Sequence, residues 1–447
     1  MSSDQTLARP MSGRAESQAA GSAPARREWT VSTVWTLFLL GVISAFNFID
    51  RSIFGLNLQL IKEEMQISDT VLGLISGIVF VSFYSIMGVP VARLADRFNR
   101  RNILAIGFTF WSAMTALTGF VTNVWQLALA RFLMGAGEST GFAPPNSMVA
   151  DLFSKANRRT GMSVMRAIAA LGGIVLFPVA GWISHEYGWR TCFIVMGMPA
   201  LVLAPLLVLT VREPVRGQSD PGGPRRADAG TFLQVLSYMR DSRSFLFMVL
   251  GGVCMATTMH TNGSWSSAFL MRIHELSAGD VGQVQGFLRQ PAAFIGGLLG
   301  GFLADRFARR DVRWRLWIPA LACLAVGPAE MLFLFAEPTW LWMLGLGLTS
   351  MFGMMQMSPV FAACLDVSKP HMRATVTALF LLVVNLMGDL IGPVSIGLMN
   401  DTLLSGMGDR AIQYSMILGA VSASAAGIFF FLGARHIDAD TRRAEAI

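Results

Sequence analysis

The chain has 447 residues, of which 53% are hydrophobic and only 14% are charged, and its formal net charge is +7. A soluble protein of this length could not bury so much apolar surface, so the composition excludes a soluble globular protein and indicates an integral membrane protein. The basic residues lie in short clusters between apolar runs, which argues against nucleic acid as a partner. The four cysteines lie in separate apolar segments without metal-site or disulfide spacing, so we predict no metal and no cofactor.

Residues 1–28 are rich in Ser, Ala, Gly and Arg and contain no apolar core, which predicts a disordered tail and excludes a secretory signal. Twelve apolar runs follow, each long enough to cross a bilayer as a helix. They lie at roughly 31–58, 68–92, 102–122, 125–151, 158–185, 189–211, 243–272, 277–304, 314–335, 338–366, 371–399 and 411–434. The sequence therefore predicts an all-α membrane protein with twelve transmembrane helices.

A linker rich in Pro, Gly and Arg at 212–242 separates the sixth run from the seventh, and its last part, TFLQVLSYMR, is expected to form a short amphipathic helix. The chain thus divides into two six-helix halves, 29–211 and 243–434, followed by a tail at 435–447. Outside the runs, 27 Lys and Arg residues lie on one side of the membrane and four on the other. By the positive-inside rule, we expect both termini to be cytoplasmic.

A ten-residue pattern occurs twice: ARLADRFNRR at 92–101 and GFLADRFARR at 301–310, an offset of 209 residues. A repeat of this length suits a duplicated half-molecule. Each copy is a short charged hairpin between two apolar runs. Its charges could form hydrogen bonds that close the hairpin and rearrange when the halves move. The alternative is a basic loop that only determines the orientation of the protein in the membrane. We expect conformational gating by Asp96, Arg97, Arg101, Asp151, Asp305, Arg306 and Arg310.

These two hairpins resemble the signature loops of the major facilitator superfamily, although Ala92, Asn99 and Ala308 replace residues that are usually glycine there. A second echo, Gly and Pro in GGIVLFPVAG and again in GDLIGPVSIG, resembles the glycine–proline motif of the fifth helix in exporters. The resemblance implies two pseudo-symmetric six-helix bundles around a central cavity.

After the Lys and Arg residues at both membrane faces are subtracted, four arginines remain inside the runs, and four acids are available to them: Arg51, Arg131, Arg166 and Arg289, with Asp50, Glu138, Glu330 and Asp389. An arginine at the centre of a membrane helix costs about 2.5–3.5 kcal/mol, so each needs a partner or water. Burial favours a neutral carboxyl group and a nearby guanidinium favours a charged one, so a carboxyl group balanced between them can load and release a proton. We expect Asp50, Glu138 and Arg51 to form such a proton-coupling site; the alternative is a permanent ion pair that fixes packing.

The sequence FIDR in the first run, GAGES and APP in the fourth and GWR after the fifth resemble the spinster-like branch of the superfamily over residues 45–215. This resemblance implies a proton-linked carrier of lysophospholipid or sphingoid-like amphiphiles, monomeric and resident in a bacterial inner membrane, with Asp50, Arg51 and Glu138 at the titrating and gating positions. Arg166 is not part of that pattern and could bind an anionic group of its own.

The resemblance also places the first, fourth, seventh and tenth runs around the cavity. On that basis we expect the substrate to contact Arg131, Arg166, His260, Arg289, Asn385 and Asp389. Glu330, near the end of the ninth run, is expected to snorkel or to pair locally. Met354, Met355 and Met357 in the tenth run suit an irregular apolar group, although such a stripe is also ordinary packing.

No phosphate-binding loop and no HExxH or GxSxG site occurs, so neither ATP-driven transport nor an enzyme is predicted. We therefore expect a proton-coupled secondary transporter that works by alternating access on a lipid-like amphiphile. The alternatives are proton-linked uptake of a small organic anion, which the buried arginines would also explain, and a membrane receptor that does not transport.

Overall fold

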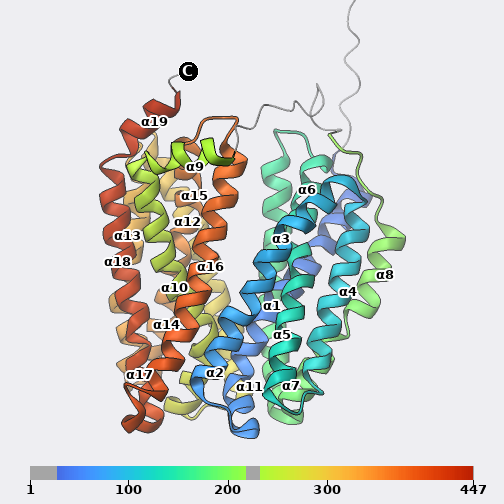
Figure 1. Ribbon diagram of the computed structural model, residues 1–447, viewed down its shortest axis with the longest axis vertical. Coiled ribbons are helices and arrows are strands. Elements are labelled where there is room, and N and C mark those ends of the chain that lie inside the picture. The colour runs from blue at the N-terminus through green and yellow to red at the C-terminus, as the bar shows by residue number, and fades with distance from the viewer. Residues whose placement is uncertain (1–27, 218–231, 446–447) are drawn as a thin grey trace, which may run out of the picture.

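The computed structural model describes residues 28–217 and 232–445, and all regular secondary structure in these ranges is helical. The expectations for the tail 1–27 and for linker positions 218–231 lie outside the described residues. Figure 1 shows two helical bundles side by side, one formed by the blue-to-green part of the chain before the grey linker and the other by the yellow-green-to-red part after it. The two predicted halves are therefore two bundles in space.

In the N-terminal half, several helical elements join end to end into single spans. The elements are α1 (Val31–Met65), α2 (Asp69–Leu74), η1 (Ile75–Val79), α3 (Phe80–Arg97), α4 (Arg100–Thr118), α5 (Val124–Glu138), η2 (Ser139–Gly141), α6 (Ala143–Leu152), α7 (Arg158–Gly197) and α8 (Ala200–Thr210). Within α7, Gly188 has φ +79° and ψ 162°, a conformation that is essentially restricted to glycine. The fifth span passes into the sixth at this residue.

The C-terminal half begins with the predicted amphipathic helix, which the structure confirms as α9 (Phe232–Arg240). The following elements are α10 (Arg243–His274), α11 (Ala278–Gln283), η3 (Val284–Arg289), α12 (Gln290–Ala308), α13 (Trp314–Phe335), α14 (Thr339–Met355), α15 (Met357–Asp366), α16 (Arg373–Asp401), η4 (Ser405–Arg410), α17 (Ala411–Ser415), α18 (Ile417–Ala434) and α19 (Ile437–Glu445). The tail after position 434 thus contains a helix, α19.

Nine helical stretches within the described ranges are long and apolar enough to cross a membrane. One of them, Arg158–Thr210, contains two spans because the chain kinks at Gly188. The third and fourth predicted spans are the remaining two, α4 and the broken stretch from α5 to α6. The helices therefore follow the twelve predicted runs in order.

The helix starts follow from local sequence. Thr30, Ser68, Asn99 and Asn123 each precede a helix, and their side-chain oxygens accept a hydrogen bond from a backbone N–H of its first turn. These residue types are favoured at N-caps because they satisfy N–H groups that have no partner within the helix. At α11 the Ser277 cap is part of a capping box with Asp280.

The duplication is visible in the backbone as well as in the hairpins. A π-helical turn, η1, interrupts the second span from Ile75, and a second one, η3, interrupts the eighth span from Val284, again 209 residues later. Each turn presents a glycine to the other half: Gly77 packs on the backbone of Asp389, and Gly286 packs on Pro178. The two halves therefore cross each other at equivalent places.

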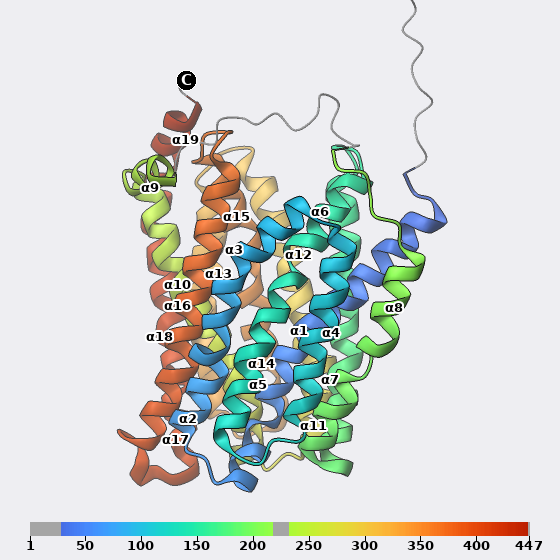
Figure 2. The same cartoon turned by 45° about the vertical axis from the view of Figure 1, so that its right-hand side comes forward.

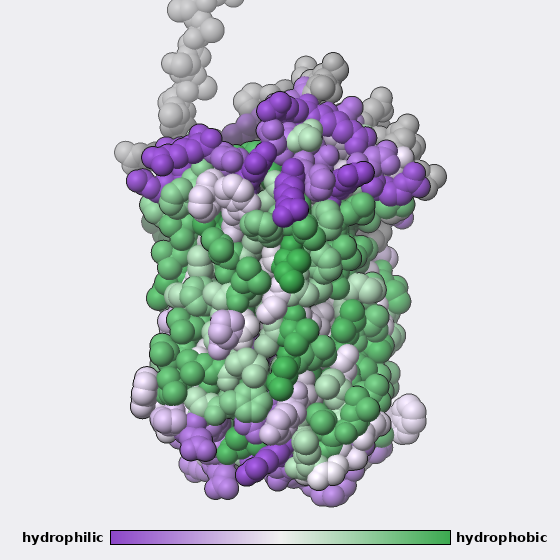
Figure 3. Space-filling view, turned by 90° about the vertical axis from the view of Figure 1, so that its left-hand side faces the viewer, coloured by the Kyte–Doolittle hydropathy of each residue, from purple (hydrophilic) through white to green (hydrophobic). Residues whose placement is uncertain are grey.

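The described ends of the chain, α9, α19 and the hairpin at 98–99 lie at one end of the molecule, which we call the terminal face (Figures 1 and 2). The turn between α1 and α2 and the segment η4–α17 lie at the other end, which we call the opposite face. Figure 3 shows a broad apolar belt between the two, with the densest hydrophilic surface at the terminal face. An apolar belt of this kind is the surface that a protein presents to lipid.

Candidate functional site

The first part of the candidate site is an ion pair between α1 and the end of α5. Arg51 Nε donates to Glu138 Oε2 at 2.5 Å, and the Glu138 side chain has no exposed surface. The Arg51 guanidinium also lies over the Tyr84 ring, 4.4 Å from its centre. The other carboxylate oxygen of Glu138, Oε1, has no hydrogen-bond partner among the described residues. Glu138 is thus held by one cation and has one free acceptor.

Asp50, the neighbour of Arg51 in sequence, points to a different helix. Its Oδ2 accepts a hydrogen bond from Trp111 Nε1 of α4 at 2.9 Å, while its Oδ1 finds no donor in the described part of the chain. The residue is completely buried, and none of the ion pairs formed by described residues includes it. A buried carboxyl group in this setting is costly as an anion and is a natural place for a proton.

Arg131 lies between these acids without a direct ion pair to either. Its guanidinium stacks on two rings, 4.5 Å from the centre of Phe54 and 5.0 Å from that of Phe80, and the side chain is buried. It interacts electrostatically with both Asp50 and Glu138. Cation–π contacts hold an arginine in place while leaving its charge available to a carboxylate or to an anionic ligand.

The C-terminal half contributes a second pair to the same region. His260 Nδ1 of α10 lies 2.6 Å from Asp389 Oδ1 of α16. The charge of Asp389 acts on Arg131 and Glu138, and that of Arg51 acts on His260, so this pair lies across from the N-terminal acids. Asn385, one turn before Asp389, is exposed and lies beside His260. We call these seven residues the central cluster: Asp50, Arg51, Arg131, Glu138, His260, Asn385 and Asp389.

The remaining two predicted substrate residues lie outside the central cluster. Arg289 Nη1 donates to the backbone oxygen of Asn262 at 3.2 Å, to Ser266 Oγ at 3.0 Å and to Gln285 Oε1 at 2.9 Å. Arg166 is exposed and makes no hydrogen bond or ion pair within the described ranges. The structure therefore joins most of the predicted charges but leaves Arg289 among neutral hydrogen-bond partners and Arg166 on its own.

At the terminal face, the centre of the first hairpin's network is Arg100, which we had not singled out. Its buried guanidinium donates to Asp151, to Glu213 Oε1 at 2.7 Å and to the backbone oxygen of Pro214 at 2.9 Å. Arg101 donates to two backbone oxygens at the end of the sixth span. Two of the predicted gating residues, Asp96 and Arg97, are exposed. The network joins parts of the N-terminal half and the start of the linker.

The second hairpin is more open. Asp305, Arg306 and Arg310 are all exposed. Nearby, Arg315 Nε of α13 pairs with Asp366 Oδ2 of α15 at 2.9 Å, which again joins helices of the same half. Between described residues, no hydrogen bond or ion pair joins the two helical halves at the terminal face.

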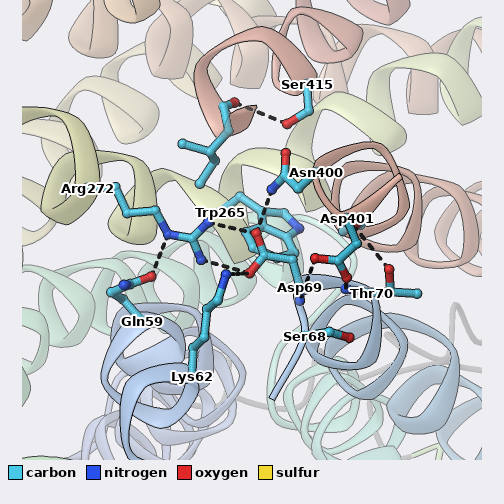
Figure 4. Close-up of polar contacts among 12 residues, drawn as sticks. Gln59, Lys62, Ser68, Asp69, Thr70, Trp265, Arg272, Asn400, Asp401 and Ser415 are labelled. Atoms are coloured by element: carbon cyan, nitrogen blue, oxygen red, sulfur yellow. Dashed lines mark hydrogen bonds and ion pairs between the residues drawn. The ribbon is translucent and has the colours of Figure 1, made fainter. Parts of the chain in front are cut away.

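The opposite face carries a network that the sequence analysis did not identify, centred on Asp69 (Figure 4). The Asp69 carboxylate accepts from Arg272 Nη1 at 2.7 Å, from Lys62 Nζ at 2.6 Å and from Asn400 Nδ2 at 2.8 Å, and its side chain is only 2% exposed. Asp69 and Lys62 belong to the N-terminal half, whereas Arg272 and Asn400 belong to the C-terminal half. We call this network the Asp69 lock.

Further contacts close the same face. Asp401, at the end of α16, accepts two hydrogen bonds from backbone N–H groups at the start of α2. The donors are Thr70, at 2.6 Å, and Asp69, at 3.3 Å. The N-terminus of a helix favours an anion there. Gly55 packs directly on the backbone of Gly263, and Gly181 packs on that of Gly282. The halves are thus held together at the opposite face.

Comparison with known proteins identifies the family of the chain. The Major Facilitator Superfamily model matches residues 40–393. An MFS-type efflux pump of Mycolicibacterium smegmatis is 33% identical over 395 residues, which cover 88% of this chain and 89% of that protein. The sphingosine-1-phosphate transporter SPNS2 of Danio rerio is 31% identical over 245 residues, 53% of this chain and 48% of that protein.

Among solved structures, a bacterial homologue of the human lysosomal transporter Spinster, in an inward-facing and unoccupied conformation, has a TM-score of 0.81 and 26% identity. The match covers 91% of this chain and 98% of that one. It confirms the predicted fold and the spinster-like resemblance, and it identifies an integral membrane transporter, not an enzyme. The chain therefore belongs to the Major Facilitator Superfamily, and its relatives include spinster-like transporters.

Proposed function

We propose that this protein is a proton-coupled carrier that moves a lipid-like amphiphile by alternating access, with the central cluster as its coupling site. The observation that carries the proposal is that Asp50 and Glu138 are completely buried and each has one oxygen without a donor among the described residues. Such carboxyl groups are stabilised by a proton or by a mobile cation, and Arg51 and Arg131 lie within reach.

The proposed cycle uses these groups in turn. When Glu138 is ionised, it holds Arg51 through the 2.5 Å contact. A proton on Glu138 removes that charge, so that Arg51 becomes available to Asp50 or to an anionic group of the substrate. Loss of the proton to the other side of the membrane restores the pair. The structure with the Arg51–Glu138 pair intact is accordingly the deprotonated end of the cycle.

The substrate class is inferred from relatives and from the site. A sphingosine-1-phosphate transporter and a Spinster homologue are among the similar proteins, which supports a substrate with an anionic or polar head and an apolar chain. In this proposal His260, Asp389, Asn385 and Arg131 bind the head within the central cluster, and Arg289 and Arg166 contact it as it enters or leaves. The similarity to an efflux pump favours export.

We further propose that the terminal face is cytoplasmic, because the segments that the sequence predicts for that side contain 27 Lys and Arg residues and those predicted for the other side contain four. The structure closed by the Asp69 lock would then be open toward the cytoplasm; the similar Spinster homologue is described as inward-facing. We expect a monomer in a bacterial inner membrane, with gating at the two hairpins.

Reconstitution into liposomes that contain a pH-sensitive dye tests the proposal. We expect lysophospholipids or sphingoid bases, added one at a time, to cause proton movement that disappears in Asp50→Asn and in Glu138→Gln. The control is Asp438→Asn, which removes only an exposed ion pair with Arg442 on α19. Proton movement driven by small carboxylates instead would support uptake of an organic anion, and binding without any flux would support a receptor.

A further inference from the structure

A second buried acid lies in the C-terminal half, away from the central cluster. Glu330, near the end of α13, was expected to snorkel or to pair locally; the side chain has no exposed surface, so it does not snorkel. Its Oε2 accepts a hydrogen bond from Asn262 Nδ2 of α10 at 3.0 Å. The acid is therefore turned into the bundle, where an anion without a counter-ion is costly.

Among the described residues no cation contacts Glu330 directly, so an anion there is stabilised only by the Asn262 hydrogen bond, the nearby Thr349 hydroxyl and the charge of Arg289. The second oxygen of Glu330, Oε1, accepts no hydrogen bond from any described residue, and it faces Gly419 of α18. The Thr349 hydroxyl of α14 lies beside the carboxyl group but does not reach hydrogen-bond geometry, and it too has no partner in the described ranges. The direction of a hydrogen bond between these two groups depends on the proton: a protonated Oε1 would donate to Thr349, and an ionised Oε1 would accept from it.

The charged groups around Glu330 can be enumerated helix by helix. α14 and α18, which pack against α13, contain no ionisable side chain. α12 and α15 also pack against α13, and their ionisable side chains are Asp305 and Arg306 in α12 and Cys364 and Asp366 in α15. α10 begins at Arg243 and further contains Cys254, His260, Arg272 and His274. Of these, His260 and Arg272 are already paired with Asp389 and Asp69. The cation whose charge acts on Glu330 is Arg289 of η3, which forms no direct ion pair with it. Glu330 and Arg289 are thus a separated pair.

Asn262 connects the two members of this pair. Its side-chain N–H group donates to Glu330, and its backbone oxygen accepts from Arg289. The other two acceptors of Arg289 Nη1, on Ser266 and Gln285, are neutral as well. Arg289 has therefore no neighbouring carboxylate, and its charge is offset at a distance only while Glu330 is ionised.

We propose that Glu330 is a second proton-binding site, built by Asn262 and Thr349, and that a proton there increases the affinity of Arg289 for an anionic group. The site itself does not depend on the proposed substrate or on the central cluster. A proton on Glu330 leaves Arg289 as an uncompensated cation, whereas release of that proton restores the offsetting charge. Proton binding and anion binding in this half are thus mutually favourable, as linkage requires.

Infrared difference spectroscopy on the full-length protein in detergent, recorded between acid and alkaline pH, tests the proton site. We expect one carboxylic C=O band that is absent in Glu330→Gln and retained in Glu138→Gln. Thr349→Val should keep the band but shift its frequency, because the acid loses its acceptor; this variant retains the carboxyl group and serves if Glu330→Gln does not fold. Three results would overturn the proposal. They are a band that responds to Na⁺ at constant pH, a band that is unchanged in Glu330→Gln, and a band that does not shift in Thr349→Val.

The link to Arg289 is tested by the binding of decyl sulfonate, an amphiphile whose charge does not change with pH. We expect roughly tenfold tighter binding on the acid side than on the alkaline side of the Glu330 titration in the wild type, because protonation removes the charge that offsets Arg289. Glu330→Gln should bind equally at both pH values. A pH dependence that persists in Glu330→Gln would contradict the link, while leaving the flux experiment on the central cluster unaffected.

Discussion

The two faces of the molecule use similar charges in opposite ways. At the terminal face, Arg100 and Arg315 each join helices within one half. At the opposite face, Asp69 binds Arg272 and Asn400 across the boundary between the halves. The difference teaches which charges keep a half rigid and which ones hold the two halves together. Only the second kind must break when the carrier changes conformation.

The central cluster lies between these faces and combines both arrangements. The Arg51–Glu138 pair and the His260–Asp389 pair each stay within one half, yet their charges act on each other across the boundary. A proton at this level can therefore alter contacts within a half and attraction between halves at the same time. This is the property that a coupling site requires in alternating access.

The largest effect is expected from Asp69→Asn, which removes the acceptor shared by Arg272 and Lys62. Breaking a buried ion pair from one side costs about 3–5 kcal/mol, and the cost falls on the closed opposite face. Spin labels at Glu63→Cys and Met407→Cys, two exposed positions on this face, should show a longer distance in Asp69→Asn than in the parent.

The matched control is Asp280→Asn on the same face, where the carboxylate only caps its own helix through Ser277. This variant should keep the short distance between the labels. An equal change in both variants would mean that the Asp69 lock does not hold the halves together.

A somewhat smaller effect of a different kind is expected from Arg100→Gln. The variant leaves Glu213 and Asp151 without the buried guanidinium, which should lower the free energy of unfolding by about 3 kcal/mol. The midpoint of thermal unfolding in detergent measures this loss, and Arg93→Gln, on an exposed side chain of the same hairpin, should not show it. The distance between the spin labels on the opposite face should stay unchanged. A longer distance in Arg100→Gln would mean that the Arg100 network also holds the two halves together.

The smallest of these effects is expected from Gly397→Ala. A methyl group at Gly397 would meet the backbone of Asp69 and Thr70 across the boundary, and overpacking of this kind costs about 1–3 kcal/mol. The variant should shift part of the population to the longer opposite-face distance. Gly297→Ala, where a methyl group meets nothing within 4 Å, is the control. Identical distance distributions for the two variants would show that the close approach at Gly397 is not needed for closure.

Much of this architecture could be predicted from the sequence because it is encoded in periodic or repeated features. The apolar runs gave the order of the spans, and the hairpins at 92–101 and 301–310 gave the duplication, which also appears in η1 and η3 at the same offset. The pairing of Arg51 with Glu138 was predictable in outline, because charges within spans need partners in a common interior, whereas the bond from Trp111 to Asp50 was not.

The parts that could not be predicted depend on helix rotation and on distant pairing. The depth of Glu330 along its helix can be estimated from sequence, but not that it turns toward Asn262. Asp69 and Arg272 are 203 residues apart and look like ordinary loop charges. Similarly, the hairpin motif contains several charged residues. The way the helices end determines which of them are buried, so that Arg100 is buried while Asp96 is exposed.

The most direct test of the central claim compares two transport modes in Glu138→Gln. One is uphill movement of a lysophospholipid driven by a pH gradient across liposomes, and the other is exchange of labelled for unlabelled substrate without a gradient. We predict that Glu138→Gln loses gradient-driven movement and retains exchange, because a permanently neutral side chain still lets the loaded carrier alternate. Gradient-driven movement that survives in Glu138→Gln would contradict the account.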